Sequence, residues 1–333
     1  MRRFGGGTFG PRAGHLLPAL VTSIVLCLIP GAAAQALSIH VSYDSSVGSA
    51  PIAFKSAFAS AVQLFETTFT DPVTININVG YGEVNGTSLD SNVAGQSLTY
   101  LAGPLTYSGV KSTLSTDSAS VADTTAVGSL GSADPTGGGN FVVSTAQAKA
   151  LNLISNDSFT DGYVGFSSSL NFSYDPNNRG VAGQYDFIGV AQHEVSEVMG
   201  RIALLGADLG SVANTYSVLD LFRYSASDTR QLVGGQTAYF SINGGTTDLL
   251  NFNKNGNADF GDWAGTTVDA ANAFASIGAL LPFSATDITE MNVIGYDVAA
   301  AAPSSVPIPD SIVLLGSGLL GLGAIRRRKR GPA

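Results

Sequence analysis

The spacing of apolar residues changes along the chain, and each spacing predicts a type of element. Residues 38–43 and 73–79 alternate between apolar and polar side chains, which is typical of half-buried strands. Residues 52–69 lie between them and carry apolar side chains at helical spacing, including Phe54 and Phe58. The folded region is therefore expected to begin with a strand, a helix and a second strand.

The middle and the end of the folded region have weaker patterns. They indicate partial helix at 99–123 and 145–153, and further strands at 163–174, 218–224 and 238–242. A hairpin turn is expected at Gly244-Gly245, and a closing helix at 286–294. Together the elements predict an α+β fold. We expect a mixed sheet with helices in the N-terminal half, one central helix and a looser C-terminal half.

The central helix has the clearest pattern. Asp186 is suited to cap its N-terminus, and Ile188 and Val195 belong to an apolar face that continues at helical spacing to Ile202. Gly206 is expected to end it, because glycine favours the backbone conformation that stops a helix. The sequence thus predicts an amphipathic helix of about four turns.

The two ends of the chain have the composition of targeting segments. Residues 1–36 contain three arginines, an apolar stretch and a run of small residues, the order found in a secretory signal peptide. The only cysteine, Cys27, lies in this segment. The exported body at 37–298 therefore has no thiol, so any metal ion in it must be bound by histidine and carboxylate side chains.

A short linker at 299–308 leads into the C-terminal segment at 306–330. This segment combines Pro307 and Pro309 with a Leu/Gly-rich apolar run and five consecutive basic residues. It resembles the PEP-CTERM sorting signal of Gram-negative bacteria, although Ile308 stands where that motif usually has Glu. The resemblance implies export, a single C-terminal transmembrane segment in the inner membrane, recognition by an exosortase, and delivery to the cell surface or the extracellular matrix. A plain tail anchor is the alternative.

Charge narrows the possible partners of the body. The chain has a formal net charge of −9, but half of its basic residues lie in the two end segments. Residues 37–305 contain eight basic and twenty-four acidic residues, a formal net charge of −16. Such a surface repels phosphate backbones and attracts cations, so nucleic acid is not expected as a partner.

Three residues of the central helix suggest metal chemistry. His193 and Glu197 are four residues apart and therefore project from one helix face, and Glu194 lies beside them. In zinc peptidases the pattern His-Glu-x-x-His supplies two ligands, and the Glu acts as general base on a metal-activated water. Glu197 replaces the second histidine here, and a carboxylate oxygen can bind zinc with similar reach. The alternative is a solvated acidic helix face with one ordinary histidine; His40 is the only other histidine of the body.

The run at 192–201 resembles the signature of exported, PEP-CTERM-associated metalloproteases of metzincin-like type. The similarity extends over about 185–298, through the segments 219–225, 238–245, 261–264 and 287–297. It implies a metzincin-like metalloprotease domain over residues 37–298 and a zinc ion as cofactor.

The same resemblance suggests the third metal ligand. Metzincins continue with His-x-x-Gly-x-x-His, whereas this chain keeps Gly200 but has Ala203 at the third-ligand position. Leishmanolysin-like proteases take their third histidine from a distant His-Trp pair, and the matching pair here begins with Asp262. Asp262 is therefore the expected third ligand, with Asp220 and Asp208 as lesser candidates. Met291 is either a Met-turn residue under the metal or, as we favour, an ordinary core residue.

The expected function is that of a secreted or surface-anchored zinc endopeptidase acting on protein or peptide substrates, with Glu194 as general base. Two anionic ligands should lower the Lewis acidity of the metal and favour harder ions such as calcium or manganese. The alternative is a non-catalytic surface or exopolysaccharide-matrix protein with a structural or vestigial metal site. A carbohydrate-active domain is a third possibility, but it would need paired carboxylates in an aromatic groove, and the chain has one Trp.

Overall fold

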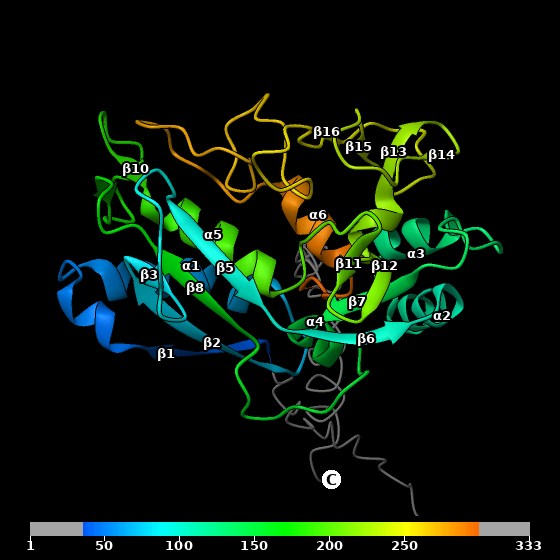
Figure 1. Cartoon of the computed structure of the whole chain (residues 1–333), viewed down its shortest axis with the longest axis horizontal. Coiled ribbons are helices and arrows are strands. Elements are labelled where there is room, and N and C mark those ends of the chain that lie inside the picture. Colours follow the sequence, from blue (N-terminus) through cyan, green and yellow to red (C-terminus); the bar gives the residue numbers. More distant parts are fainter. Residues whose placement is uncertain (1–35, 300–333) are drawn as a thin grey trace, which may run out of the picture. The chain divides into compact units, whose positions relative to one another are not determined.

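Strand β1 (Ser38–Tyr43), helix α1 (Phe54–Thr68) and strand β2 (Thr74–Tyr81) confirm the predicted opening of the domain. In the computed structural model, which describes residues 36–299, β1 and β2 pair in parallel (Figure 1). Helix α1 buries the apolar face that the spacing predicted, including Phe54.

The main sheet has the strand order β1-β2-β8-β5. Strand β8 (Gly162–Phe166) is parallel to β2, and β5 (Gly95–Thr99) runs antiparallel at the edge. The strand expected at 163–174 is shorter than predicted: it ends at Phe166, and Phe172–Ser173 forms a separate strand, β9, paired with β10 (Tyr185–Asp186).

Helix α5 (Phe187–Val198) is the predicted central helix, and it packs against α1 and along β5 (Figure 1). The Asp186 side chain caps it by accepting a hydrogen bond from the Gly189 N–H, as expected. The predicted end near Ile202, with Gly206 beyond it as the stop, is wrong. The helix stops at Val198, and Gly200 adopts a φ of 108°, a left-handed conformation that glycine tolerates best.

A second four-stranded sheet, not anticipated from the sequence, has the order β11-β12-β7-β6. Its strands are β6 (Leu101–Leu105), β7 (Asn140–Ser144), β11 (Ala207–Leu209) and β12 (Val212–Tyr216). The partial helix predicted in the same region is confirmed as α2 (Tyr107–Asp117), α3 (Val121–Gly128) and α4 (Thr145–Ala150). Two small elements near the first sheet are the 3-10 turn η1 (Ser45–Ser49) and the hairpin of β3 (Glu83–Val84) and β4 (Thr87–Ser88).

The C-terminal half is looser, as expected, with short strands in the order β14-β13-β15-β16. These are β13 (Arg223–Ala226), β14 (Thr229–Arg230), β15 (Tyr239–Phe240) and β16 (Leu250–Asn251). The strand predicted at 218–224 is wrong in its first part: Leu219–Phe222 forms the 3-10 turn η2, because the Ser217 N–H and the Asp220 carboxylate bond to each other across the turn. The closing helix is confirmed as α6 (Ala285–Val293).

The predicted α+β class is therefore confirmed, with mixed sheets and six α-helices among residues 36–299. Within that described range no helix has the length and apolar character needed to cross a bilayer. The predicted signal peptide at 1–36, apart from its last residue, lies outside the described residues. So do nearly all of the linker at 299–308 and the whole sorting signal at 306–330 with its transmembrane segment.

Candidate metal centre

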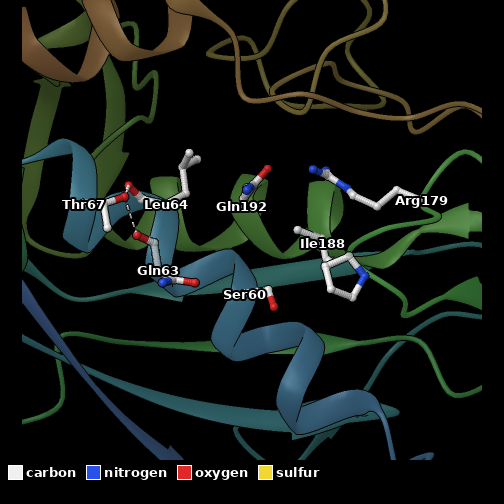
Figure 2. A pocket seen from close by; sticks show the side chains of 8 residues that line it. Ser60, Gln63, Leu64, Thr67, Arg179, Ile188 and Gln192 are labelled. Atoms are coloured by element: carbon white, nitrogen blue, oxygen red, sulfur yellow. Dashed lines mark hydrogen bonds between the residues drawn. The ribbon is translucent and has the colours of Figure 1, made fainter.

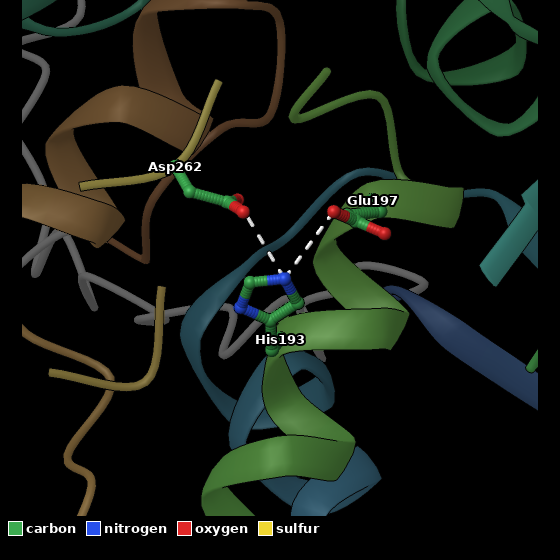
Figure 3. A group of neighbouring side chains, drawn as sticks. All are labelled: His193, Glu197 and Asp262. Atoms are coloured by element: carbon green, nitrogen blue, oxygen red, sulfur yellow. Dashed lines mark ion pairs between the residues drawn. The ribbon is translucent and has the colours of Figure 1, made fainter. Parts of the chain in front are cut away.

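His193, Glu197 and Asp262 come together at one point above helix α5. His193 and Glu197 lie one helical turn apart on α5, and Asp262 reaches them from the segment between β16 and α6 (Figure 3). His193 Nε2 is 3.3 Å from Glu197 Oε1 and 3.6 Å from Asp262 Oδ1. One donor atom from each residue lies within 4.8 Å of the other two, so the group could hold a metal ion.

The two separations from His193 match the spacing of ligands around one ion. Zinc ligands lie about 2.1 Å from the metal, and two of them at the tetrahedral angle are about 3.4 Å apart. The observed 3.3 Å and 3.6 Å bracket this value. The nitrogen and the two carboxylate oxygens, each within 4.8 Å of the other two, could therefore bind one small divalent ion.

Each of the three side chains is oriented by a partner from another part of the chain. His193 Nδ1 lies 2.9 Å from the Ala270 carbonyl oxygen, which accepts its N–H, so Nε2 is the nitrogen that can bind a metal once it has lost its proton. The Ser97 hydroxyl of β5 donates to Glu197 Oε2 at 2.7 Å. Arg201 Nη1 donates to Asp262 Oδ1 at 2.9 Å. Such outer contacts are typical of metal ligands, because they fix the direction of each donor atom.

The segment that carries Asp262 is held to the core by the residue that follows it. Trp263 is 1% exposed, packs against Phe252 with ring centroids 4.9 Å apart, and donates from its indole N–H to Asp287 Oδ1 at 2.6 Å. The Asp262 carbonyl also accepts a hydrogen bond from the Asn253 N–H. These contacts explain why an Asp next to a Trp in a strand-poor segment has a defined position.

The charges of the metal-free group favour a protonated imidazole between two carboxylates. Burial lowers the pKa of His193, but the Asp262 and Glu197 carboxylates together raise it to about 10 despite the opposing charge of Arg201. Burial by itself would raise the pKa of Glu197; His193, Arg201 and the Ser97 hydroxyl hold it at about 2. The proton on His193 thus occupies the place that a cation would take.

Glu194 lies in the same cleft as the three candidate ligands. The cleft has a volume of about 890 Å³ and runs between β5 on one side and residues 257–281 on the other. Glu194 is 5% exposed, and burial and then the Glu197 charge raise its pKa well above the ordinary value. β5 approaches it closely at Gly95, where an added Cβ would lie 2.5 Å from Glu194 Oε1. The cleft thus combines the candidate ligands with a buried carboxyl group.

Other sequence candidates lie outside this group. Asp220 is buried and accepts hydrogen bonds from the backbone N–H groups of Leu204, Leu205 and Ser217, so it has a structural role. Asp208 accepts from the Asn214 N–H in the β11–β12 turn. Met291 is fully buried in the hydrophobic core on α6, as favoured from the sequence.

A second hollow lies on the opposite side of α5, between this helix and α1 (Figure 2). Its volume is about 310 Å³, and its lining residues include Gln63 of α1 and Ile188 and Gln192 of α5. No carboxylate or imidazole is among the residues that line it, and its one cation, Arg179, is paired with Asp186 at 2.8 Å. The candidate chemistry therefore lies in the larger cleft.

Sequence reasoning missed the residues that orient the ligands. Ser97 and Ala270 had no local signal, because their contacts with α5 span 100 and 77 residues. Arg201 was part of the segment that carried the family resemblance, and its position four residues after Glu197 was the available clue.

Comparison of the chain with known protein families, with curated proteins and with solved structures gave no match.

Proposed function

We propose that the protein is a zinc-dependent endopeptidase of metzincin-like type, exported and anchored at the cell surface through its C-terminal segment. The observation that carries this proposal is the convergence of His193, Glu197 and Asp262, whose donor atoms lie within 4.8 Å of one another and whose separations from His193 match those of zinc ligands. The resemblance of the segment at 192–201 to PEP-CTERM-associated metalloproteases belongs to the same proposal. The substrate is a protein or peptide, and an exosortase is the expected processing partner.

The arrangement of the main sheet supports an endopeptidase. The antiparallel edge strand β5 runs along α5, and its residues Gly95, Ser97 and Thr99 line the cleft that contains the ligands. The three ligands and Glu194 line the same cleft, so an extended peptide bound in it would lie beside them. The cleft of about 890 Å³ has room for several residues of such a chain.

The mechanism assigns each residue one task. A zinc ion at this site would activate a water molecule and polarise the scissile carbonyl. His193, Glu197 and Asp262 would hold the ion, and the Ser97 hydroxyl fixes the direction of the Glu197 carboxylate by donating to it. Glu194 accepts a proton from the attacking water and transfers it to the leaving amine. Its pKa is raised in the metal-free protein, and a nearby cation acts in the opposite direction, toward the basic form that this role needs.

A second candidate function is a non-catalytic surface or matrix protein, and one observation favours it. Without a metal, protonated His193 lies between the Glu197 and Asp262 carboxylates, and Arg201 also contacts Asp262. These ion pairs satisfy one another, so the group can persist as a structural network with no catalytic function. This alternative predicts a stable fold without metal and no chelator-sensitive cleavage.

The test is casein cleavage and zinc content in the purified chain and in Glu194→Gln. The variant keeps the size of the side chain and all three ligands, so it should bind zinc like the native protein and lose cleavage by about 100-fold or more. Glu66→Gln is the matched control, because Glu66 lies on α1 outside the cleft and the Gln oxygen can still accept the Ile39 N–H, so this variant should cleave normally. Unchanged cleavage in Glu194→Gln removes this residue from its role. Zinc-free protein with no cleavage favours the matrix function.

A further inference from the structure

Arg201 lies three residues beyond helix α5, and its side chain is completely buried. Its Nε donates to the Ser196 hydroxyl at 2.8 Å. Its Nη1 donates to Asp262 Oδ1 at 2.9 Å and to the Gly261 carbonyl at 3.3 Å. The guanidinium therefore connects the helix that carries two candidate ligands with the segment that carries the third.

The same guanidinium lies beside both anionic ligands. Asp262 Oδ1, which accepts the Arg201 bond, is also the oxygen that lies 3.6 Å from His193 Nε2. A carboxylate oxygen has two lone pairs, so one can accept from Arg201 while the other faces an ion. Arg201 Nη2 lies 3.9 Å from Glu197 Oε1, too far for a hydrogen bond but close enough for attraction between the charges.

The charge of the surroundings explains why a cation is needed at this position. Besides the two anionic ligands, Glu194 is buried nearby, and the residues that line the cleft include no Lys or Arg. Glu290 of α6 is also fully buried, and neither of its oxygens has a hydrogen-bond partner among the described residues. Burial lowers the pKa of Arg201, but Asp262, Glu290 and Glu197 raise it above the ordinary value, so its charge is retained.

We infer that Arg201 is the positioning residue that makes Asp262 a metal ligand and allows one site to combine two carboxylate ligands with a single histidine. This inference rests on the proposed metal site. The charged hydrogen bond fixes the direction of the Asp262 carboxylate, and the positive charge offsets the repulsion between the two anionic ligands. Arg201 itself does not touch the ion or the substrate.

The direct test is the zinc affinity of the purified full chain, measured by competition with a chromogenic chelator. Arg201→Gln should weaken zinc binding by about 10- to 100-fold, the usual effect of losing an orienting contact. Arg201→Lys keeps the charge and one donor, and it should recover part of the lost affinity. Arg230→Gln is the control and should bind zinc like the native chain. Arg230 also donates hydrogen bonds to backbone carbonyls, those of Leu221 and Ser129, but contacts none of the candidate ligands.

Two further measurements separate positioning from a general effect on folding. The visible absorption of the cobalt(II)-loaded protein reports coordination geometry, and Arg201→Lys should change this spectrum whereas Arg230→Gln should not. In an Asp262→Ala background, Arg201→Lys should have little additional effect on zinc affinity, because its action passes through Asp262. This comparison remains available if Arg201→Gln does not fold.

The outcomes distinguish the inference from the proposed function. Native zinc affinity and a native cobalt spectrum in Arg201→Lys and Arg201→Gln overturn the role of Arg201 and leave the metal site intact. If Arg201→Lys lowers zinc affinity equally in the native and the Asp262→Ala backgrounds, the role of Arg201 is also overturned, because its effect then does not depend on Asp262. A native chain that binds neither zinc nor cobalt ends both proposals at once.

Discussion

Replacement of Asp262 by Asn changes one atom of the candidate site, a carboxylate oxygen that becomes an amide nitrogen. The fold contacts of this residue are largely preserved, because the amide oxygen can still accept the Arg201 bond that Asp262 Oδ1 accepts at 2.9 Å. The anionic ligand is lost. Asp262→Asn therefore separates metal binding from the packing of the segment around Trp263.

The expected magnitude follows from the number of ligands. The free energy of zinc binding to a protein site is about 12 kcal/mol, so each of three or four ligands contributes about 3 to 4 kcal/mol of it. The amide oxygen is a weak neutral ligand, and we therefore expect the lower value of about 3 kcal/mol, roughly a 100-fold rise in the Kd for zinc. The substitution also replaces the charged partner of Arg201 in a buried ion pair, so that only neutral acceptors remain on that side. The free energy of unfolding of the metal-free protein should therefore fall by about 2 to 3 kcal/mol.

Both quantities are accessible in the same preparation. Competition with a chelator gives the zinc Kd, and urea unfolding with and without zinc gives the stability of each form. In the native protein zinc should raise the unfolding midpoint, and in Asp262→Asn this rise should shrink or disappear. A variant whose zinc Kd stays within about threefold of the native value would show that Asp262 is not a ligand.

Three further predictions concern protonation and packing. Zinc must displace the proton that the raised pKa of about 10 keeps on His193, so the apparent affinity should increase with pH between about 6 and 9, with about one proton released per zinc in calorimetry. A constant affinity over this range would contradict the assignment of His193. Burial raises the pKa of Asp71 from 3.8 to about 7, so ionisation of this group lowers the stability of the native protein as pH rises from about 4 to 7. In urea unfolding at pH 8, the free energy of unfolding of Asp71→Asn should therefore exceed that of the native protein by about 2 to 4 kcal/mol, whereas at pH 4 the two should be equally stable. Gly95→Ala places a Cβ 2.5 Å from Glu194 Oε1 and should reduce casein cleavage at least 10-fold with zinc content unchanged, whereas normal cleavage would show that β5 can move aside.

The part of the site on α5 was predictable because it is local. Asp186 is the N-cap and the apolar face is continuous, so the phase of the helix is fixed and His193 and Glu197 must share a face. The prediction of Asp262 as a ligand rests on the resemblance of Asp262-Trp263 to a His-Trp pair and not on any periodic pattern. Asp262 lies beside His193 because the next residue, Trp263, is buried and donates a hydrogen bond to Asp287, a contact that a single sequence does not reveal.

The parts that could not be predicted depend on long-range pairing. Strands of two residues, such as β16 (Leu250–Asn251), are too short for alternation to be detected. The second sheet depends on the pairing of β12 with β7, which joins Thr215 to Asn140 far away in the sequence. The end of α5 was misplaced because Ile202 continues the helical spacing while Gly200 already leaves the helix. Ser97 meets Glu197 only because β5 pairs antiparallel with β8 at the sheet edge.

The metal itself provides the most direct test of the account. The metal-free purified chain is titrated with zinc by calorimetry, alongside His193→Ala and a preparation at the same pH that contains a chelator. We expect one tightly bound zinc per native chain, no such binding in His193→Ala, and cleavage of casein that follows zinc occupancy. Native protein that takes up no stoichiometric zinc, or His193→Ala that binds zinc as tightly as the native chain, would contradict it.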